Sequence, residues 1–131
     1  MFLNKECDYA IRVVRTLADL EKKSVKEICD HEHIPTPFAY KILKKLERAG
    51  LVSSHRGSHG GYRLAKQPDH ITLHEIIKAV DESVYLHECM KSDHKCPNHS
   101  SGNPCGVHQE FERIQGLIES ALKEKTIDKV I

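Results

Sequence analysis

Residues 36–66 read TPFAYKILKKLERAGLVSSHRGSHGGYRLAK, a helical pattern followed at once by a hairpin pattern. The first half repeats apolar side chains at the spacing of one helical face, at Ala39, Ile42, Leu43 and Leu46. Thr36 is expected to cap this helix, with Pro37 at its first position, where the missing N–H costs nothing. Ala49-Gly50 would end it with a left-handed residue. Two β-prone runs then flank a glycine-rich tip, which predicts a β-hairpin over residues 51–66.

Three further helices are predicted on either side of this stretch. Residues 8–22 (DYAIRVVRTLADLEK) carry one apolar face, made of Ile11, Val14, Leu17 and Ala18. Ser24 and Glu27 form a capping box, which predicts a second helix that runs to about Glu32. Thr72 opens another capping box before a fourth helix, whose core face consists of Leu73, Ile76, Ile77 and Val80.

This order of elements is that of a winged helix-turn-helix, in which the third helix enters the major groove and the hairpin forms a wing. The helix face opposite the apolar stripe carries the side chains expected to contact DNA, namely Thr36, Pro37, Tyr40, Lys41, Lys44 and Arg48. Its first turn would reach base edges, and its cations, Lys45 included, would neutralise phosphates. In the wing, Gly60 and its neighbours would let the backbone approach DNA closely. Arg56 and Arg63 flank the tip, where an arginine can enter a narrow minor groove.

The distribution of charge supports a polyanionic partner. The 131-residue chain has a formal net charge of only +1. Residues 36–66, however, hold seven Lys or Arg side chains and one Glu, a local balance of +6. A basic patch confined to one segment is an electrostatic footprint for nucleic acid. A solvated cationic face is the alternative, and the position of the patch on the predicted reading helix and wing favours DNA.

A heptad spacing of apolar residues marks the carboxyl-terminal region, at Val107, Phe111, Ile114, Ile118 and Ala121. Such a seam predicts a helix of about 18 residues and roughly 27 Å. A lone helix with an apolar seam needs a partner, most simply the same helix of a second subunit. Packing onto its own domain is the alternative.

Residues 87–108 (HECMKSDHKCPNHSSGNPCGVH) gather three of the five cysteines and four of the ten histidines. In a reducing compartment, clustered cysteines more often bind metal than form disulfides. Structural zinc sites favour cysteines two to four residues apart, whereas these cysteines are separated by six and eight residues. Longer gaps suit a larger group, such as an iron–sulfur cluster. A single metal ion such as zinc and a thiol redox switch are the alternatives.

The composition predicts a soluble, mainly α protein with a small β-hairpin wing, because 39% of its residues are apolar and 30% are charged. No apolar run approaches the ~18 residues that span a membrane, so we expect a cytoplasmic protein without membrane contacts. The loop offers neither a rigid pocket nor an oxyanion site, so we do not expect an enzyme. Residues 1–84 would form the winged helix-turn-helix DNA-binding domain, 85–106 the cysteine and histidine loop, and 107–131 a long dimerisation helix and tail.

Four segments together resemble the Rrf-two family of bacterial winged-helix transcription factors, which includes the iron–sulfur regulator IscR and the nitric-oxide sensor NsrR. They are CDYAIRVV, GLVSSHRGSHGGYRLAK, ITLHEIIKAVDES and the three-cysteine loop. The resemblance covers nearly the whole chain and is most specific from the wing to the fourth helix. It implies a homodimer that binds a palindromic DNA operator. It also implies an iron–sulfur cluster held by Cys89, Cys96 and Cys105.

The resemblance leaves the fourth ligand open between two residues, and another ligand, such as a loop histidine, is the remaining alternative. His108 corresponds to the ligand of the IscR-like branch, and Asp8, from the other subunit, to that of the NsrR-like branch. The cysteine gaps are longer than is usual in the family, which favours Asp8 and leaves a two-iron or a four-iron cluster undecided. The expected function is therefore a homodimeric, sequence-specific transcriptional regulator whose DNA affinity depends on the cluster.

Two alternatives to this function follow from the residues. One is a regulator of the same fold without a cluster, which senses thiol oxidation, zinc or a bound partner. The other is an iron–sulfur carrier that never binds DNA, against which the basic patch argues.

Overall fold

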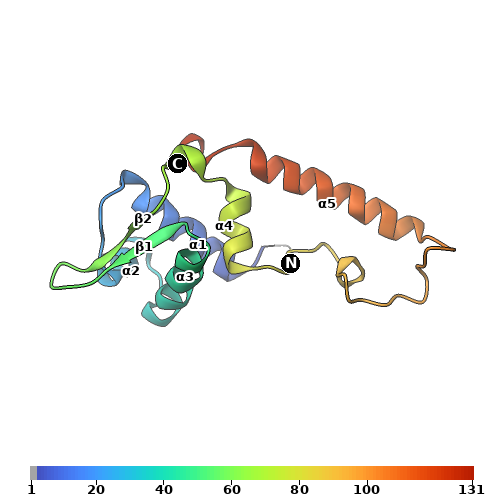
Figure 1. Cartoon of the computed structure of the whole chain (residues 1–131), viewed down its shortest axis with the longest axis horizontal. Helices are drawn as coiled ribbons and strands as arrows, with labels where there is room; N and C mark the ends of the chain where they lie inside the picture. The colour runs from blue at the N-terminus through green and yellow to red at the C-terminus, as the bar shows by residue number, and fades with distance from the viewer. Residues whose placement is uncertain (1–2) are drawn as a thin grey trace.

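The computed structural model describes residues 3–131 and shows a mainly helical molecule with a two-stranded sheet (Figure 1). The wing and the cysteine loop lie at opposite ends of the molecule, and α5 runs between the loop and the rest of the chain (Figure 1). The main elements are α1 (Lys5–Thr16), α2 (Val25–Glu32), α3 (Thr36–Arg48), β1 (Val52–His55), β2 (Gly61–Leu64), α4 (Leu73–Val80) and α5 (Gly106–Glu124). Short 3-10 turns supplement them, η1 (Leu17–Asp19), η2 (Pro68–His70), η3 (Glu88–Met90) and η4 (Ile127–Lys129).

Helix α1 begins and ends earlier than the predicted range of 8–22. The side chain of Asn4 accepts a hydrogen bond from the Cys7 amide at 3.0 Å, and this cap starts the helix at Lys5. At the other end, Leu20 adopts a left-handed conformation with a φ of 66° and terminates the 3-10 turn. The buried face therefore lies nearer the amino terminus than predicted, with Ile11 and Ala18 only half-buried, and consists of Cys7, Tyr9, Ala10, Val13, Val14, Thr16 and Leu17.

The capping boxes of α2 and α4 are confirmed. The Glu27 amide donates to the Ser24 hydroxyl at 3.1 Å, and the Glu27 carboxylate accepts from the Ser24 amide at 2.6 Å. Thr72 and Glu75 form the same reciprocal pair in front of α4. These boxes satisfy amides that a helix start otherwise leaves without partners.

Helix α3 starts one residue earlier than predicted. Pro35 occupies the capping position and Thr36 is the first helical residue, so the prediction that Thr36 caps the helix was wrong. Pro37 is tolerated because the first helical turn has no intrahelical use for its N–H. The other end is confirmed, since Gly50 adopts a φ of 76°. The buried stripe is also confirmed, at Ala39, Ile42, Leu43 and Leu46.

The hairpin is antiparallel, with Val52 opposite Leu64 and His55 opposite Gly61. Its second strand also pairs with the segment before α2, because the Lys23 and Tyr62 backbones exchange hydrogen bonds of 2.8 and 2.9 Å. A side chain at Gly61 would collide with the Lys23 carbonyl, so glycine is required where these backbones approach. This pairing fixes the base of the wing to the helices.

The core lies between α1, α3 and α4, and the end of the chain returns to it. Ile127 is fully buried, and its amide donates to the Ile71 carbonyl at 2.7 Å. Thr126 forms an isolated bridge with Thr72 on the same edge. The segment that holds the cysteine loop and α5 is thus attached to α4 at both ends. It leaves α4 directly after Val80, and the chain returns to the start of α4 at Ile127.

Candidate nucleic-acid interface and cysteine loop

The outer face of α3 is open to solvent along its length. Tyr40 is 55% exposed, and the other exposed positions of this face are Thr36, Pro37, Lys41, Lys44 and Arg48. Within the described chain, Lys44 and Arg48 form no salt bridge. A cation without a carboxylate partner is free to neutralise a phosphate.

Two other lysines of α3 are paired, which the sequence did not reveal. The carboxylate of Glu6, on the first turn of α1, accepts a hydrogen bond from Lys45 at 2.6 Å and another from Lys41. These bonds hold the pKa of Glu6 below its usual value. Lys45 also donates to the Val80 carbonyl at 2.8 Å, so it joins α3 to α1 and to the end of α4. Lys45 therefore helps to pack α3 against α1 and α4, and its phosphate contact stays a prediction.

Phe38, which was not among the predicted DNA contacts, is 45% exposed in the first turn of α3. Its ring packs edge-on against Tyr9, with 5.8 Å between the ring centroids. An exposed apolar ring at the start of a reading helix can contact thymine methyl groups. The sequence contained a signal for this exposure. Phe38 directly precedes Ala39, the first residue of the buried stripe, so its side chain points to a different side of the helix.

The wing presents its arginines to solvent. Arg56 and Arg63 are both exposed and, among residues 3–131, neither pairs with a carboxylate. Gly57 has a φ of 114°, which a residue with a side chain rarely adopts. A Cβ atom at Gly60 would lie 2.7 Å from the His55 carbonyl oxygen, so the tip must stay narrow. The wing can therefore bring backbone and arginine close to a duplex together.

The loop that carries the three candidate cysteine ligands contains no buried residue between 85 and 105. Cys89, Cys96 and Cys105 are all free thiols of intermediate exposure. Among the described residues, no group of three or more Cys, His, Asp or Glu side chains is placed to hold one metal ion. The structure of one subunit thus supplies suitable donors without bringing the three thiols to a common point.

A smaller group of candidate donors does assemble at the start of α5. The rings of His99 and His108 stack with centroids 4.0 Å apart, and the Cys105 amide donates to His99 Nδ1 at 3.0 Å. The His108 side chain is 12% exposed, and its Nε2 lies 3.4 Å from Glu112. Its Nδ1 is buried and has no hydrogen-bond partner in the described chain. Such an orphaned nitrogen, three residues after Cys105 in the sequence, suits an additional ligand for a thiolate-bound group.

Asp8 lies elsewhere. Its carboxylate is 49% exposed and forms a salt bridge of 3.0 Å with Arg12 on the next turn of α1. Helix α1 belongs to the end of the molecule that carries the wing, far from the cysteine loop of the same chain (Figure 1). Within one subunit, Asp8 is therefore not brought together with the three cysteines.

Helix α5 is confirmed, and its apolar side chains are only partly covered by the rest of the chain. Val107 is 62% exposed and Ala121 is also exposed, while Phe111, Ile114 and Ile118 are half-buried. Phe111 packs against His87 of the loop. Leu117, which the heptad analysis left out, is 58% exposed. Its spacing from Ile114 and Ala121, three and four residues, was the signal that it shares their side of the helix.

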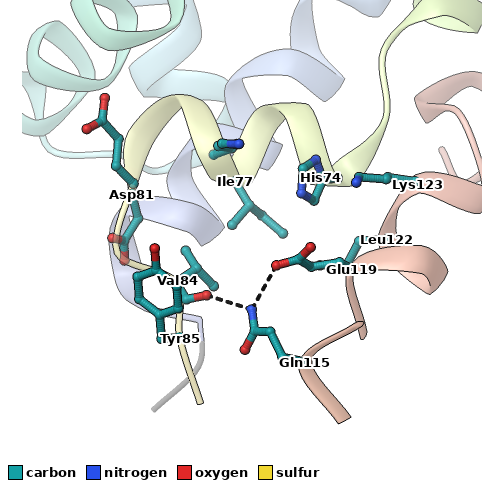
Figure 2. A pocket seen from close by; sticks show the side chains of 11 residues that line it. His74, Ile77, Asp81, Val84, Tyr85, Gln115, Glu119, Leu122 and Lys123 are labelled. Carbon is teal, nitrogen blue, oxygen red and sulfur yellow. Dashed lines mark hydrogen bonds between the residues drawn. The ribbon is translucent and has the colours of Figure 1, made fainter. Parts of the chain in front are cut away.

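One polar residue attaches α5 to the connector between α4 and the loop. Gln115 is 6% exposed and is the buried residue of α5. Its amide nitrogen donates to the Val84 carbonyl at 2.9 Å, and its oxygen accepts from the Leu86 amide at 3.1 Å. The amide also donates to Glu119 at 3.1 Å. Figure 2 shows the bonds to Val84 and Glu119 at the floor of a pocket.

This pocket has a volume of about 140 Å³ and lies between α4, the connector and α5 (Figure 2). Its wall contains His74, whose pKa is lowered by burial and then by the charge of Lys123. Of the three carboxylates in its lining, Asp81 accepts a hydrogen bond from Asn4 and Glu119 accepts one from Gln115, and the third is Glu82. The pocket therefore marks the joint between the winged helix and α5.

Comparison with known proteins places the chain in a family. A family described as "Rrf2: Iron-dependent Transcriptional regulator" matches residues 3–131. An HTH-type transcriptional regulator of Aquifex aeolicus is 34% identical, over all of this chain and 92% of that protein. The HTH-type transcriptional regulator NsrR of Shouchella clausii is 32% identical, over 93% of this chain and 78% of that protein.

Solved structures share the fold. The IscR of T. potens superimposes with a TM-score of 0.73 and 24% identity, over 98% of this chain and 84% of the other. CymR, described as the global cysteine regulator of B. subtilis, has a TM-score of 0.76 and 21% identity, over 98% and 94%. Within residues 3–131, none of the helices combines the length and apolar character that a membrane crossing requires. The exposed basic reading helix, the wing and the family match agree, and the chain belongs to the Rrf2 family of winged-helix transcriptional regulators.

Proposed function

We propose that this protein is a cytoplasmic homodimer that binds a palindromic DNA operator, with an affinity set by an iron–sulfur cluster on Cys89, Cys96 and Cys105. The observation that carries the proposal is one loop with three free, half-exposed thiols at the foot of an uncovered apolar helix. The names NsrR and IscR among its relatives support the same assignment.

The DNA contacts follow from exposure and charge. The first turn of α3 offers Thr36, Pro37 and Tyr40 to base edges, with Phe38 beside them. Lys44 and Arg48 neutralise phosphates, while Arg56 and Arg63 of the wing reach the minor groove. Two such surfaces in a symmetric dimer read half-sites one helical turn apart, about 34–36 Å, so a small rotation between subunits would change affinity.

The donor chemistry suits a cluster, although the loop must close to gather the thiols. Thiolates are the ligands that iron–sulfur clusters prefer, and such a cluster would supply sensitivity to oxidation or to iron supply. Within one subunit, the buried and unpartnered His108 Nδ1, three residues after Cys105, supports His108 as the fourth ligand. Asp8 of the partner subunit could serve only in a dimer and only after it leaves Arg12. The geometry thus favours His108, contrary to the preference drawn from cysteine spacing.

A regulator without a cluster is the second candidate, because the three thiols are not gathered and a cysteine regulator shares the fold. In that case the loop would sense through thiol oxidation, zinc or a bound partner. Either candidate leaves the DNA-binding surface unchanged.

Anaerobic purification followed by iron and sulfide analysis separates the two candidates. A brown protein with stoichiometric iron and sulfide, lost in Cys89→Ala and Cys105→Ala, is the expected result. Cys29→Ala is the matched control, because Cys29 is buried in α2 and should keep the iron. Operator affinity is then measured with and without the cluster. Colourless protein that binds its operator with unchanged affinity after thiol alkylation would contradict sensing by the cysteines of this loop.

A further inference from the structure

The carboxylate of Glu6 connects three helices at the edge of the DNA-binding surface. It lies on the first turn of α1 with 22% of its side chain exposed, and it accepts hydrogen bonds from Lys41 and Lys45 of α3. Lys45 is held a second time by the Val80 carbonyl at 2.8 Å. The two lysines therefore differ, because Lys45 would remain fixed without Glu6 whereas Lys41 would not.

Lys41 is the lysine that faces the solvent side of α3. Its side chain is 54% exposed, against 32% for Lys45. Lys41 also lies three residues before Lys44, so both belong to the same side of the helix. A phosphate that approaches this side meets Lys44 without a competitor but must displace Glu6 from Lys41. It also meets the negative charge of Glu6 itself.

We propose that Glu6 sets the DNA affinity of this protein by occupying Lys41 in competition with the DNA backbone. Each phosphate contact releases counterions and adds to affinity for any sequence. A carboxylate that occupies one of these cations removes such a contact and so lowers sequence-independent binding. Base contacts of the first turn then contribute a larger share of the total, which improves discrimination.

The test is Glu6→Gln, which keeps the shape of the side chain and removes its charge. Affinity for duplex DNA should rise several-fold, and the slope of log affinity against log salt should steepen by about 0.9, the value of one phosphate contact. Glu110→Gln is the matched control, because it removes an equal charge from another lysine- or arginine-bound carboxylate, on α5. Its salt slope should equal that of the wild type. A folded Glu6→Gln protein with wild-type or weaker affinity would overturn the proposal.

A second pair of variants tests the same point without disturbing Glu6. Lys41→Ala should change affinity and salt slope much less than Lys44→Ala, since Lys41 is already occupied. In the Glu6→Gln background, Lys41→Ala should remove what that substitution gained. Equal losses for Lys41→Ala and Lys44→Ala in the wild-type chain would refute the proposal, even if Glu6→Gln failed to fold. No loss in Lys44→Ala would instead refute phosphate contacts by this side of α3.

Discussion

Between Lys5 and Val80, every α-helix and both strands contribute buried apolar side chains, whereas within residues 81–126 the one buried residue is the polar Gln115. We call these parts the winged-helix half (residues 3–80) and the arm (residues 81–126). The first is stabilised by its own core. The arm leaves several apolar side chains and its thiols partly or fully exposed, which is where the proposed function places a second subunit and a bound group. One chain thus separates the part that reads DNA from the part that can respond.

The largest effect is expected where the arm meets its proposed partner. Ile114→Glu and Leu117→Glu each place a charge in the proposed interface, and the symmetry of a dimer introduces it twice. Burying an unpaired charge costs several kcal/mol per ion, so the dimer should dissociate. Sedimentation should show monomers that no longer bind a palindrome tightly. Gln109→Glu, at an exposed position on the same helix, should stay dimeric. Dimers in both apolar variants would mean that the arm packs within one subunit.

The second expected effect is on the stability of the winged-helix half. Leu43 is fully buried in α3, so Leu43→Ala should lower the free energy of unfolding by about 2–5 kcal/mol. Cys96→Ala, in the arm, should change it by less than about 0.5 kcal/mol in chelator-treated protein. Urea denaturation at one fixed protein concentration measures both. Comparable losses in the two variants would remove the distinction between a packed half and an open arm.

The third expected effect is on DNA binding and is confined to the winged-helix half. Lys44→Ala should weaken binding to specific and non-specific duplexes alike and reduce the salt slope by about 0.9. Arg56→Ala should lose more affinity on A·T-rich flanks than on G·C-rich ones, because the minor groove is narrower there. Titrations at several salt concentrations check both, with Lys129→Ala near the carboxyl terminus as the control. Unchanged slopes in both variants would exclude contacts by this helix and wing.

The smallest expected effect concerns His74, at the joint between the two parts. Burial and Lys123, with a contribution from Lys78, lower its pKa, and the opposing effects of Glu119 and Glu75 are weaker. Below its usual pKa of about 6.5, the unfolded chain therefore binds a proton more readily than the folded one. Stability should fall as the pH drops from about 6.5 through the folded pKa.

Thermal unfolding at pH 5.5 and 7.5 measures this dependence, which amounts to a few degrees at most. His74→Gln should flatten it. The exposed His70, changed in the same way, should not. The same pH dependence of the melting temperature in wild type and His74→Gln would show that protonation of His74 does not affect stability.

The winged-helix half could be predicted from the sequence because its signals are local. Apolar spacing located the buried side of α3, and two capping boxes located the starts of α2 and α4. Errors arose at helix ends. Asn4 caps α1 before the predicted range begins, and Pro35 occupies the capping position that was predicted for Thr36. The pairing of Glu6 with Lys41 and Lys45 joins residues more than thirty positions apart, and no spacing rule encodes such a contact.

The arm was less predictable for a different physical reason. The residue types predicted a ligand-binding loop, but no sequence pattern specified how the three cysteines lie relative to one another, and the structure of one subunit does not gather them. The return of Ile127 to the core was missed because one apolar residue between Thr126 and Asp128, in a short tail, carries no periodic signal. Gln115 was missed because a polar residue beside an apolar seam looks like an ordinary solvent-facing position.

The hydrogen bond from the Leu86 amide to Gln115 also affects how fast that amide exchanges its proton with solvent. The Gln115 oxygen holds the Leu86 amide proton, although the surrounding connector is open to water. That proton can exchange with solvent only when the connector detaches from α5, so its exchange rate in deuterated water counts such openings. The Leu86 amide therefore reports the frequency of these openings. Its exchange rate, measured with and without iron and with and without DNA, would report how often the connector detaches from α5 in each state.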